Sequence, residues 1–177
     1  MTQQAPLSLI EFAQMLRAFP ATLLSEVGIL PEPVLVWRPG PDEWCVKEVV
    51  GHLIETEERG FAGRVRLLLV APDPIFQAWD PPAVARERGD ADRPAGELLK
   101  TFLDLRLTSA VLVERLTTAD LDRSGRHPQV GRLTIGDLLG EWVHHDREHL
   151  RQIMANVQAY VWPQLGGAQR FKSAPVQ

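Results

Sequence analysis

The chain has 177 residues, of which 45% are hydrophobic and 24% are charged, and its formal net charge is −4. This composition suits a single globular domain over residues 1–177, and the one cysteine excludes an internal disulfide and favours a reducing, cytoplasmic compartment. The acidic balance argues against nucleic acid as the main partner, and the lack of a membrane-spanning apolar run and of a signal-peptide pattern argues against a membrane partner.

The first predicted helix begins at Ser8. Ser8 and Glu11 have the spacing of a capping box, in which each side chain satisfies the other residue's backbone N–H. Apolar residues then follow at helical spacing as far as Val27. Pro20 interrupts this stripe, and we expect a kink or a break there because proline lacks the N–H and clashes with the preceding turn. Prolines and a glycine within residues 31–41 predict a connecting loop.

The second predicted helix covers residues 46–70, and Cys45 and Glu48 occupy the positions of a capping box ahead of it. A thiol at a helix N-terminus has a lowered pKa, but we interpret Cys45 as a substitute cap rather than as a nucleophile. Residues 73–94 show little periodicity, and long connections of this kind are often functional. The segment either lies across one end of the fold, anchored by Trp79, or is a tolerated surface loop.

The third predicted helix covers residues 95–116, and a polar connection separates it from a fourth helix over 134–161. Thr134 and Asp137 form another capping-box pattern at the start of that fourth helix. The last residues, 164–177, are small and polar, and we expect them to be loosely held. Because no segment alternates as a strand does, the elements predict an all-α four-helix bundle. Its neighbouring helices are expected to be antiparallel or nearly so, with a long connection between the second and third.

Three of the five histidines lie where helical spacing turns them inward. His145 and His149 are four residues apart, so they lie one turn apart on one face of the last helix. His52 lies between Val49 and Leu53 on the apolar stripe of the second helix. Neighbouring helix axes are about 8–10 Å apart, so the three imidazoles can reach one divalent ion and leave a fourth position for water or substrate.

Alternatives stay open on the residues alone. A histidine on an apolar face is more often buried and hydrogen-bonded than a metal ligand, so the histidines of a plain structural bundle could bind nothing. Glu55 and Glu141, each one turn from a candidate ligand, are either acceptors that orient an imidazole or solvated helix residues. His144 is expected on the surface, and His127 is either a turn residue or a residue at the mouth of the site.

Two stretches of the sequence resemble a known family. The stretch Pro39–Leu53, in which Trp44 and a helix cap precede His52, is similar to the first signature of the DinB-like superfamily of bacterial damage-inducible proteins. The stretch His145–Ile153 is similar to its second signature, and Arg106 also fits the family pattern. The resemblance covers most of the chain, and the order and spacing of the motifs are more specific than either motif alone.

The resemblance implies a four-helix bundle, usually dimeric, in which His52, His145 and His149 bind nickel, zinc or another divalent transition metal. Several members of the superfamily are metal-dependent transferases or isomerases that use bacillithiol, mycothiol or glutathione, and others have no known activity. The resemblance therefore implies a stress-related homodimer that transfers a low-molecular-weight thiol to a small-molecule electrophile. A metal-dependent hydrolase and a non-catalytic protein that sequesters a metal or a small ligand remain the alternatives.

Overall fold

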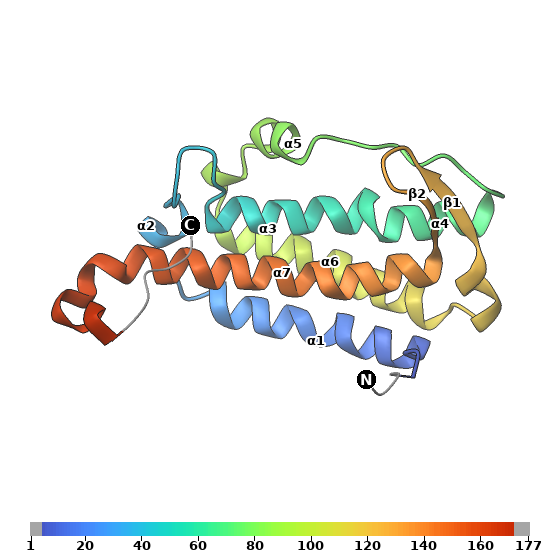
Figure 1. The fold of residues 1–177 in the computed structure, drawn as a ribbon, viewed down its shortest axis with the longest axis horizontal. Helices are drawn as coiled ribbons and strands as arrows, with labels where there is room; N and C mark the ends of the chain where they lie inside the picture. The colour runs from blue at the N-terminus through green and yellow to red at the C-terminus, as the bar shows by residue number, and fades with distance from the viewer. Residues whose placement is uncertain (1–4, 172–177) are drawn as a thin grey trace.

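The computed structural model describes residues 5–171, and most of this chain is helical (Figure 1). The long helices are α1 (Leu9–Val27), α3 (Val46–Glu55) continued by α4 (Ala62–Val70), α6 (Ala95–Glu114) and α7 (Ile135–Val161). The short elements are α2 (Glu32–Leu35), the π-helical turn η1 (Thr56–Gly60), α5 (Pro81–Arg88), the 3₁₀ turns η2 (Asp90–Asp92), η3 (Thr118–Asp122) and η4 (Trp162–Phe171), and the strands β1 (Ser124–His127) and β2 (Gly131–Thr134). The predicted four-helix bundle is confirmed, with one small hairpin added to it.

The helices of the bundle do not all run antiparallel to their neighbours. Both α1 and α3 pack against α6 and α7. The colours in Figure 1 show that α3 and α6 run in the same direction, as do α1 and α7, whereas the other neighbouring pairs are antiparallel. The expectation of antiparallel neighbours is therefore wrong for two pairs. The physical reason is the connection of residues 71–94, which is long enough to return along the whole bundle before α6 begins.

Local caps begin two of the long helices as predicted. The Glu11 carboxylate accepts a hydrogen bond from the Ser8 backbone N–H at 2.7 Å, and the Asp137 carboxylate accepts one from the Thr134 N–H at 2.8 Å. Pro20, however, does not end α1. Proline cannot donate to the carbonyl of Leu16 four residues earlier, and a guanidinium nitrogen of Arg106 donates to that carbonyl instead at 3.3 Å.

The predicted second helix is correct in its extent but is interrupted in its middle. After α3 the backbone forms the π turn η1, and the N–H of Phe61 donates to the carbonyl of Thr56, five residues earlier, at 2.7 Å. Turns of this type insert one extra residue into a helix and are frequent at functional sites. The turn begins four residues after His52, so it shifts the face that α4 presents relative to α3.

The connection of residues 71–94 contains secondary structure, although its sequence shows little helical periodicity. It contains α5 and η2, and the buried carboxylate of Asp90 holds its end against the bundle. Arg88 and Arg93 donate to Asp90 at 2.6 and 2.9 Å. Gly51 of α3 makes this approach possible, because a Cβ at that position would lie 1.9 Å from the Asp90 carboxylate.

Replacing Gly51 with alanine is expected to lower the free energy of unfolding by about 1–3 kcal/mol, because the added methyl group displaces a buried ion-paired carboxylate. Gly140 is the matched control, since it lies within α7 and nothing in the described chain comes within 4 Å of a Cβ built there. Alanine at Gly140 is expected to stabilise the protein by about 0.5–1 kcal/mol. Urea denaturation measures the free energy of unfolding of both variants. Equal changes in the two variants would contradict the close packing of Asp90 on α3.

The polar connection before the last helix forms a β-hairpin, which the sequence did not predict. The strands β1 and β2 pair antiparallel from Ser124–Thr134 to His127–Gly131. Arg126 on the outer edge of β1 exchanges two backbone hydrogen bonds of 2.8 Å with Pro74 and Phe76 of the long connection. Each strand has only four residues, too few for a recognisable alternation. The segment that pairs with the outer edge of β1 lies far from it in the sequence.

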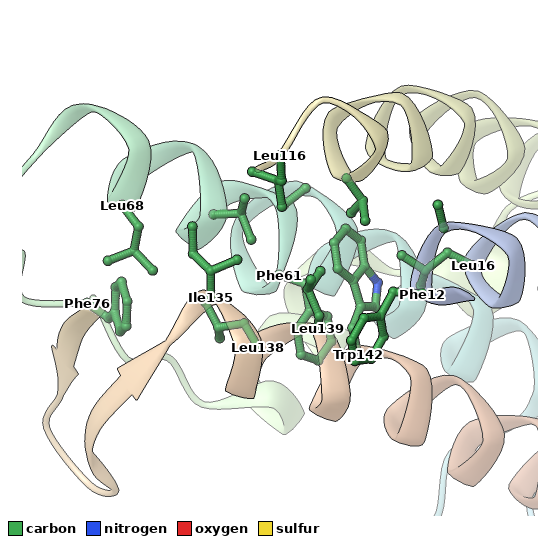
Figure 2. Close-up of a cluster of buried hydrophobic side chains, with 14 residues drawn as sticks. Phe12, Leu16, Phe61, Leu68, Phe76, Leu116, Ile135, Leu138, Leu139 and Trp142 are labelled. Carbon is green, nitrogen blue, oxygen red and sulfur yellow. The ribbon is translucent and has the colours of Figure 1, made fainter. Parts of the chain in front are cut away.

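Two clusters of buried side chains form the core. Figure 2 shows the first cluster, in which Phe61 and Trp142 stack with ring centroids 5.3 Å apart. The second cluster lies nearer the start of α3 and includes Phe19 and Phe102, whose rings meet edge to face at 5.8 Å. His145 packs on Phe61, so the candidate histidines lie where the first cluster meets the second.

After α7 the C-terminal segment forms 3₁₀ turns that are interrupted by a kink at Gly166. The tail predicted over residues 164–177 begins inside η4, and residues 172–177 lie outside the described part of the chain. Within residues 5–171, every helix is too short or too polar to cross a membrane.

Candidate metal centre

The structure brings together the three histidines that the sequence selected. His145 and His149 lie on the same face of α7, and their Nε2 atoms are 3.2 Å apart. Across the interface between α3 and α7, the Nε2 atom of His52 lies 3.1 Å from the Nε2 atom of His145. One ring nitrogen from each residue therefore converges on a common point, and these atoms all lie within 4.8 Å of one another.

The spacing of these nitrogens fits a transition-metal ion. Two imidazole nitrogens bound to one ion at about 2.0–2.1 Å, with a tetrahedral angle between them, lie about 3.3 Å apart. The two separations of 3.1 and 3.2 Å are close to this value. The Nε2 atom of His145 takes part in both, and a single neutral nitrogen cannot satisfy two other imidazoles as well as a bound cation satisfies all three. The residues present therefore fit a metal ion held by three histidines.

Neighbouring side chains fix the orientation of the imidazole rings. The Nδ1 atom of His149 lies 2.8 Å from the side-chain oxygen of Gln152, and donation from Nδ1 to that oxygen leaves Nε2 unprotonated for a metal. Trp44 packs against His52 with ring centroids 4.9 Å apart, and Phe61 packs against His145 at 5.2 Å. These aromatic contacts limit the rings to orientations in which their Nε2 atoms converge.

The three candidate ligands, His52, His145 and His149, are neutral at physiological pH. Burial lowers the pKa of His52 to about 3 and that of His145 to about 2, and the charges of neighbouring residues add to this effect. Burial also lowers the pKa of His149, although the hydrogen bond to Gln152 opposes it. Neutral imidazole is the form that binds metals, so protons do not compete for these nitrogens near pH 7.

A cavity of about 780 Å³ opens beside the candidate ligands His52 and His145. Its wall combines the π turn, the long connection and the hairpin: Thr56, Gly60, Phe61, Arg64, Ala78, Trp79, Asp80, Pro81, His127, Gln129 and Glu141. The volume is typical of a small-molecule site. Three ligands on one side leave room for a fourth ligand from the cavity, an arrangement found in catalytic rather than structural metal sites.

Glu55 and Glu141, the two acidic residues considered as hydrogen-bond acceptors for the imidazoles, lie in different environments. Glu55 is buried and pairs with Arg59 and Arg88 instead of a histidine, so both alternatives, an acceptor for an imidazole and a solvated helix residue, are wrong for it. The reason is that α5, which the hydrophobic pattern of the sequence did not predict, brings Arg88 against α3. Glu141 is exposed and lines the cavity. It has no hydrogen bond to a candidate ligand within the described residues.

The structure also shows the positions of Cys45, His127 and His144, the other residues considered from the sequence. Cys45 is the N-cap residue of α3, as expected, and the Glu48 carboxylate accepts from its backbone N–H at 2.9 Å. Its pKa is raised by burial rather than lowered by the helix terminus, which removes the nucleophile reading. His127 is not only a turn residue, because it ends β1 and lines the cavity. His144 is exposed, as predicted.

Sequence reasoning missed a buried ionic network directly behind the histidines. Two guanidinium nitrogens of Arg106 donate to the two carboxylate oxygens of Asp146 at 2.6 and 2.8 Å. The Nε atom of Arg106 donates to Glu57 in the π turn, and Glu57 also accepts from the Trp142 indole at 3.0 Å. One signal was present: Asp146 follows Trp142 by four residues and therefore lies on the buried face of α7.

Comparisons with known proteins identify a family, relatives and a solved structure of the same fold. A family model described as the DinB superfamily matches residues 15–153. A "putative metal-dependent hydrolase" of Oceanobacillus iheyensis is 25% identical over 67% of this chain and 68% of its own, and one of Bacillus licheniformis is 29% identical over 83% and 84%. The solved structure of YfiT from Bacillus subtilis is titled "a probable metal-dependent hydrolase with an unusual four-helix bundle topology". It shares the fold with a TM-score of 0.79, 22% identity, and coverage of 88% of this chain and 91% of that one.

Proposed function

The chain belongs to the DinB superfamily, and from that premise we propose that it is a metal-dependent enzyme in which His52, His145 and His149 hold one divalent transition metal ion. The observation that carries the proposal is the convergence of three neutral imidazole nitrogens at the wall of a small-molecule cavity. Imidazole ligands suit zinc, nickel, copper and iron. The relatives named as metal-dependent support a metal at this position.

We propose that the reaction transfers a low-molecular-weight thiol, such as bacillithiol or glutathione, to a small electrophile. The thiol loses its proton, its sulfur forms a bond to the electrophilic carbon, and the leaving group departs with the bonding electrons. A divalent ion, when bound, lowers the pKa of a thiol or a water molecule that it contacts and so supplies a nucleophile at neutral pH.

Two residues of the cavity wall can move the proton. Burial, and then the charge of Arg64, lower the pKa of His127, so its imidazole is neutral at pH 7 and able to accept a proton. The Nδ1 atom of His127 lies 3.3 Å from the backbone nitrogen of Gln129, and this contact orients the ring. Glu141, exposed at the cavity wall, is a carboxylate within the same space. We propose that His127 or Glu141 receives the proton of the bound nucleophile.

Hydrolysis is the second candidate, because the relatives carry hydrolase names and the same groups can activate water. In that reaction Glu141 or His127 removes a proton from water, whose oxygen attacks the carbonyl carbon of an ester or amide. The bond to the alcohol or amine then breaks, and this leaving group takes up the proton. Both candidates need the three histidines and the cavity. They differ in the nucleophile, so an assay that varies the nucleophile separates them.

The test uses purified protein stripped with a chelator and then reloaded with zinc or nickel. We expect metal-dependent conjugation of bacillithiol or glutathione to monochlorobimane, measured by fluorescence and lost on chelation. No metal-dependent conjugation with any of several thiols would contradict the transferase. Metal-dependent cleavage in a panel of esters and amides would support the hydrolase instead, and metal retained without any turnover would indicate a binding protein.

A further inference from the structure

Arg64 is partly buried and lines the same cavity as His52 and His145. The other arginines that lie partly or fully inside the protein nearby are compensated: Arg88 pairs with Asp90, and Arg106 pairs with Asp146. Arg64 makes no ion pair with any carboxylate within residues 5–171. Its Nε atom is buried and has no hydrogen-bond partner in that part of the chain. The guanidinium therefore has N–H groups that no carboxylate of the described chain uses.

Aromatic rings hold Arg64 in place without using its N–H groups. The guanidinium carbon lies 5.0 Å from the ring centroid of Trp79 and 5.4 Å from that of Phe76. Contacts over the ring face stabilise the cation and leave the N–H donors of its planar group directed outward from its edge. Burial lowers the pKa of Arg64, as expected for a cation that has lost water and gained no anion.

Trp79 contributes a second donor without a partner. Its indole Nε1 is buried and, over the described chain, has no hydrogen-bond acceptor, although tryptophan usually finds one when its N–H is buried. The ring of Trp79 lies close to Gly60 in the π turn, 3.4 Å from the position that a Cβ would occupy there. The long connection therefore brings the indole of Trp79 to the wall of the cavity that Arg64 also lines.

We propose that Arg64, assisted by the indole N–H of Trp79, binds a carboxylate of the substrate, so that the thiol used by this enzyme is a small carboxylic acid. This inference rests on the proposed function for the role of the metal centre, but the anion site stands on its own contacts. A planar guanidinium matches a carboxylate through parallel hydrogen bonds. A phosphate dianion suits the cavity less well, because Arg64 is its only arginine or lysine among the described lining residues, and Asp80 and Glu141 lie in the same wall.

The first experiment compares two thiols that differ in one group. Isothermal titration calorimetry of the zinc-loaded protein is done with 3-mercaptopropionate and with 3-mercapto-1-propanol. We expect the carboxylate to bind at least about tenfold more tightly, as a charge-assisted hydrogen bond allows. Arg64→Gln is expected to remove this preference and to leave the affinity for the alcohol unchanged. Arg64→Lys is expected to retain part of it. Equal affinity of the intact protein for both thiols would overturn the inference.

The second experiment reads the anion site without the metal. Propionate is titrated into the metal-free protein while ¹H–¹⁵N spectra follow the indole signal of Trp79, which the Trp79→Phe variant assigns. We expect a saturable shift that disappears in Arg64→Gln and persists in Arg66→Gln, because Arg66 is an exposed arginine on the same helix. A shift that survives Arg64→Gln, or tighter binding of inorganic phosphate than of propionate, would contradict a carboxylate site.

The two experiments keep the two proposals separate. If zinc fails to bind while propionate still shifts the Trp79 signal in an Arg64-dependent way, the proposed function fails and the anion site remains. If zinc binds and thiols react, but neither probe distinguishes Arg64→Gln from the unaltered protein, the proposed function remains and the carboxylate specificity is wrong.

Discussion

Replacement of Arg106 with leucine is expected to lower the free energy of unfolding by about 3–5 kcal/mol, the cost of breaking a buried ion pair by removing one partner. Arg106 is fully buried and is the cation that both Asp146 and Glu57 contact. Burial raises the pKa of both carboxyl groups even though Arg106 opposes it, which shows how poorly they are solvated. Without the guanidinium, two carboxyl groups would face each other in the core.

The Arg106→Leu variant loses a hydrogen bond in addition to the positive charge. Arg106 also donates to the carbonyl of Leu16, the group that Pro20 leaves without its helical partner. Removing Arg106 therefore leaves a buried carbonyl unpaired in the middle of α1 and adds a second cost to the first. We expect α1 to become the first helix that loses protection in hydrogen exchange, because this hydrogen bond is one of the contacts that join α1 to α6.

Glu57→Gln is the matched control for this prediction. The glutamine keeps an oxygen at the position that accepts from Arg106 and Trp142, and it resembles the protonated form that burial favours. Its expected cost is below about 1 kcal/mol. Urea denaturation followed by far-ultraviolet circular dichroism measures both variants, and Arg106→Lys supplies an intermediate value if the leucine variant does not fold. A leucine variant no less stable than Glu57→Gln would show that the network contributes no net stability.

His145→Ala is expected to lower the affinity for zinc or nickel by more than about 100-fold, since loss of an outer-shell partner alone typically costs 10–100-fold. The Nε2 atom of His145 lies near those of both other histidines, at 3.1 and 3.2 Å. Its removal leaves two imidazoles that no longer enclose the ion. Gln152→Ala is expected to cause a smaller loss, about 10-fold, because it removes the hydrogen-bond acceptor that orients His149.

His144→Ala is the control for the metal prediction, because His144 is the exposed neighbour of His145 on the same helix. Elemental analysis of untagged protein and competition with a chromogenic chelator give the stoichiometry and the affinity. We expect near one ion per chain in the unaltered protein and in His144→Ala. Unchanged metal content in His145→Ala would place the ion elsewhere, and no bound metal in the unaltered protein would return the cluster to a structural role.

Much of the fold could be predicted because its signals are local. The capping boxes of Ser8 and Thr134 depend on partners three residues away, and these contacts form as soon as the helix does. The pairing of His145 with His149 has the same origin, since one helical turn fixes their shared face. His52 could be added because its apolar neighbours identify the buried side of its helix.

The features that were missed depend on residues far apart in the chain. Arg88 reaches Glu55 across thirty-three positions, and Arg106 reaches Asp146 across forty. Sequence spacing does not identify such ion pairs, because many other pairs of oppositely charged residues have similar separations along the chain. The hairpin was missed because its strands have only four residues each and because the outer edge of β1 pairs with the distant residues Pro74 and Phe76.

The sequence by itself determined where the four long helical stretches lie, which face of each is apolar, and which three histidines are turned inward, because helical periodicity and caps act over a few residues. Only the tertiary structure decided the direction of α6 beside α3, the π turn after His52 and the cavity that Arg64 and Trp79 share with the histidines. Those features arise when separate elements compete to bury apolar surface and to pair every buried polar group, and that outcome depends on the whole chain at once.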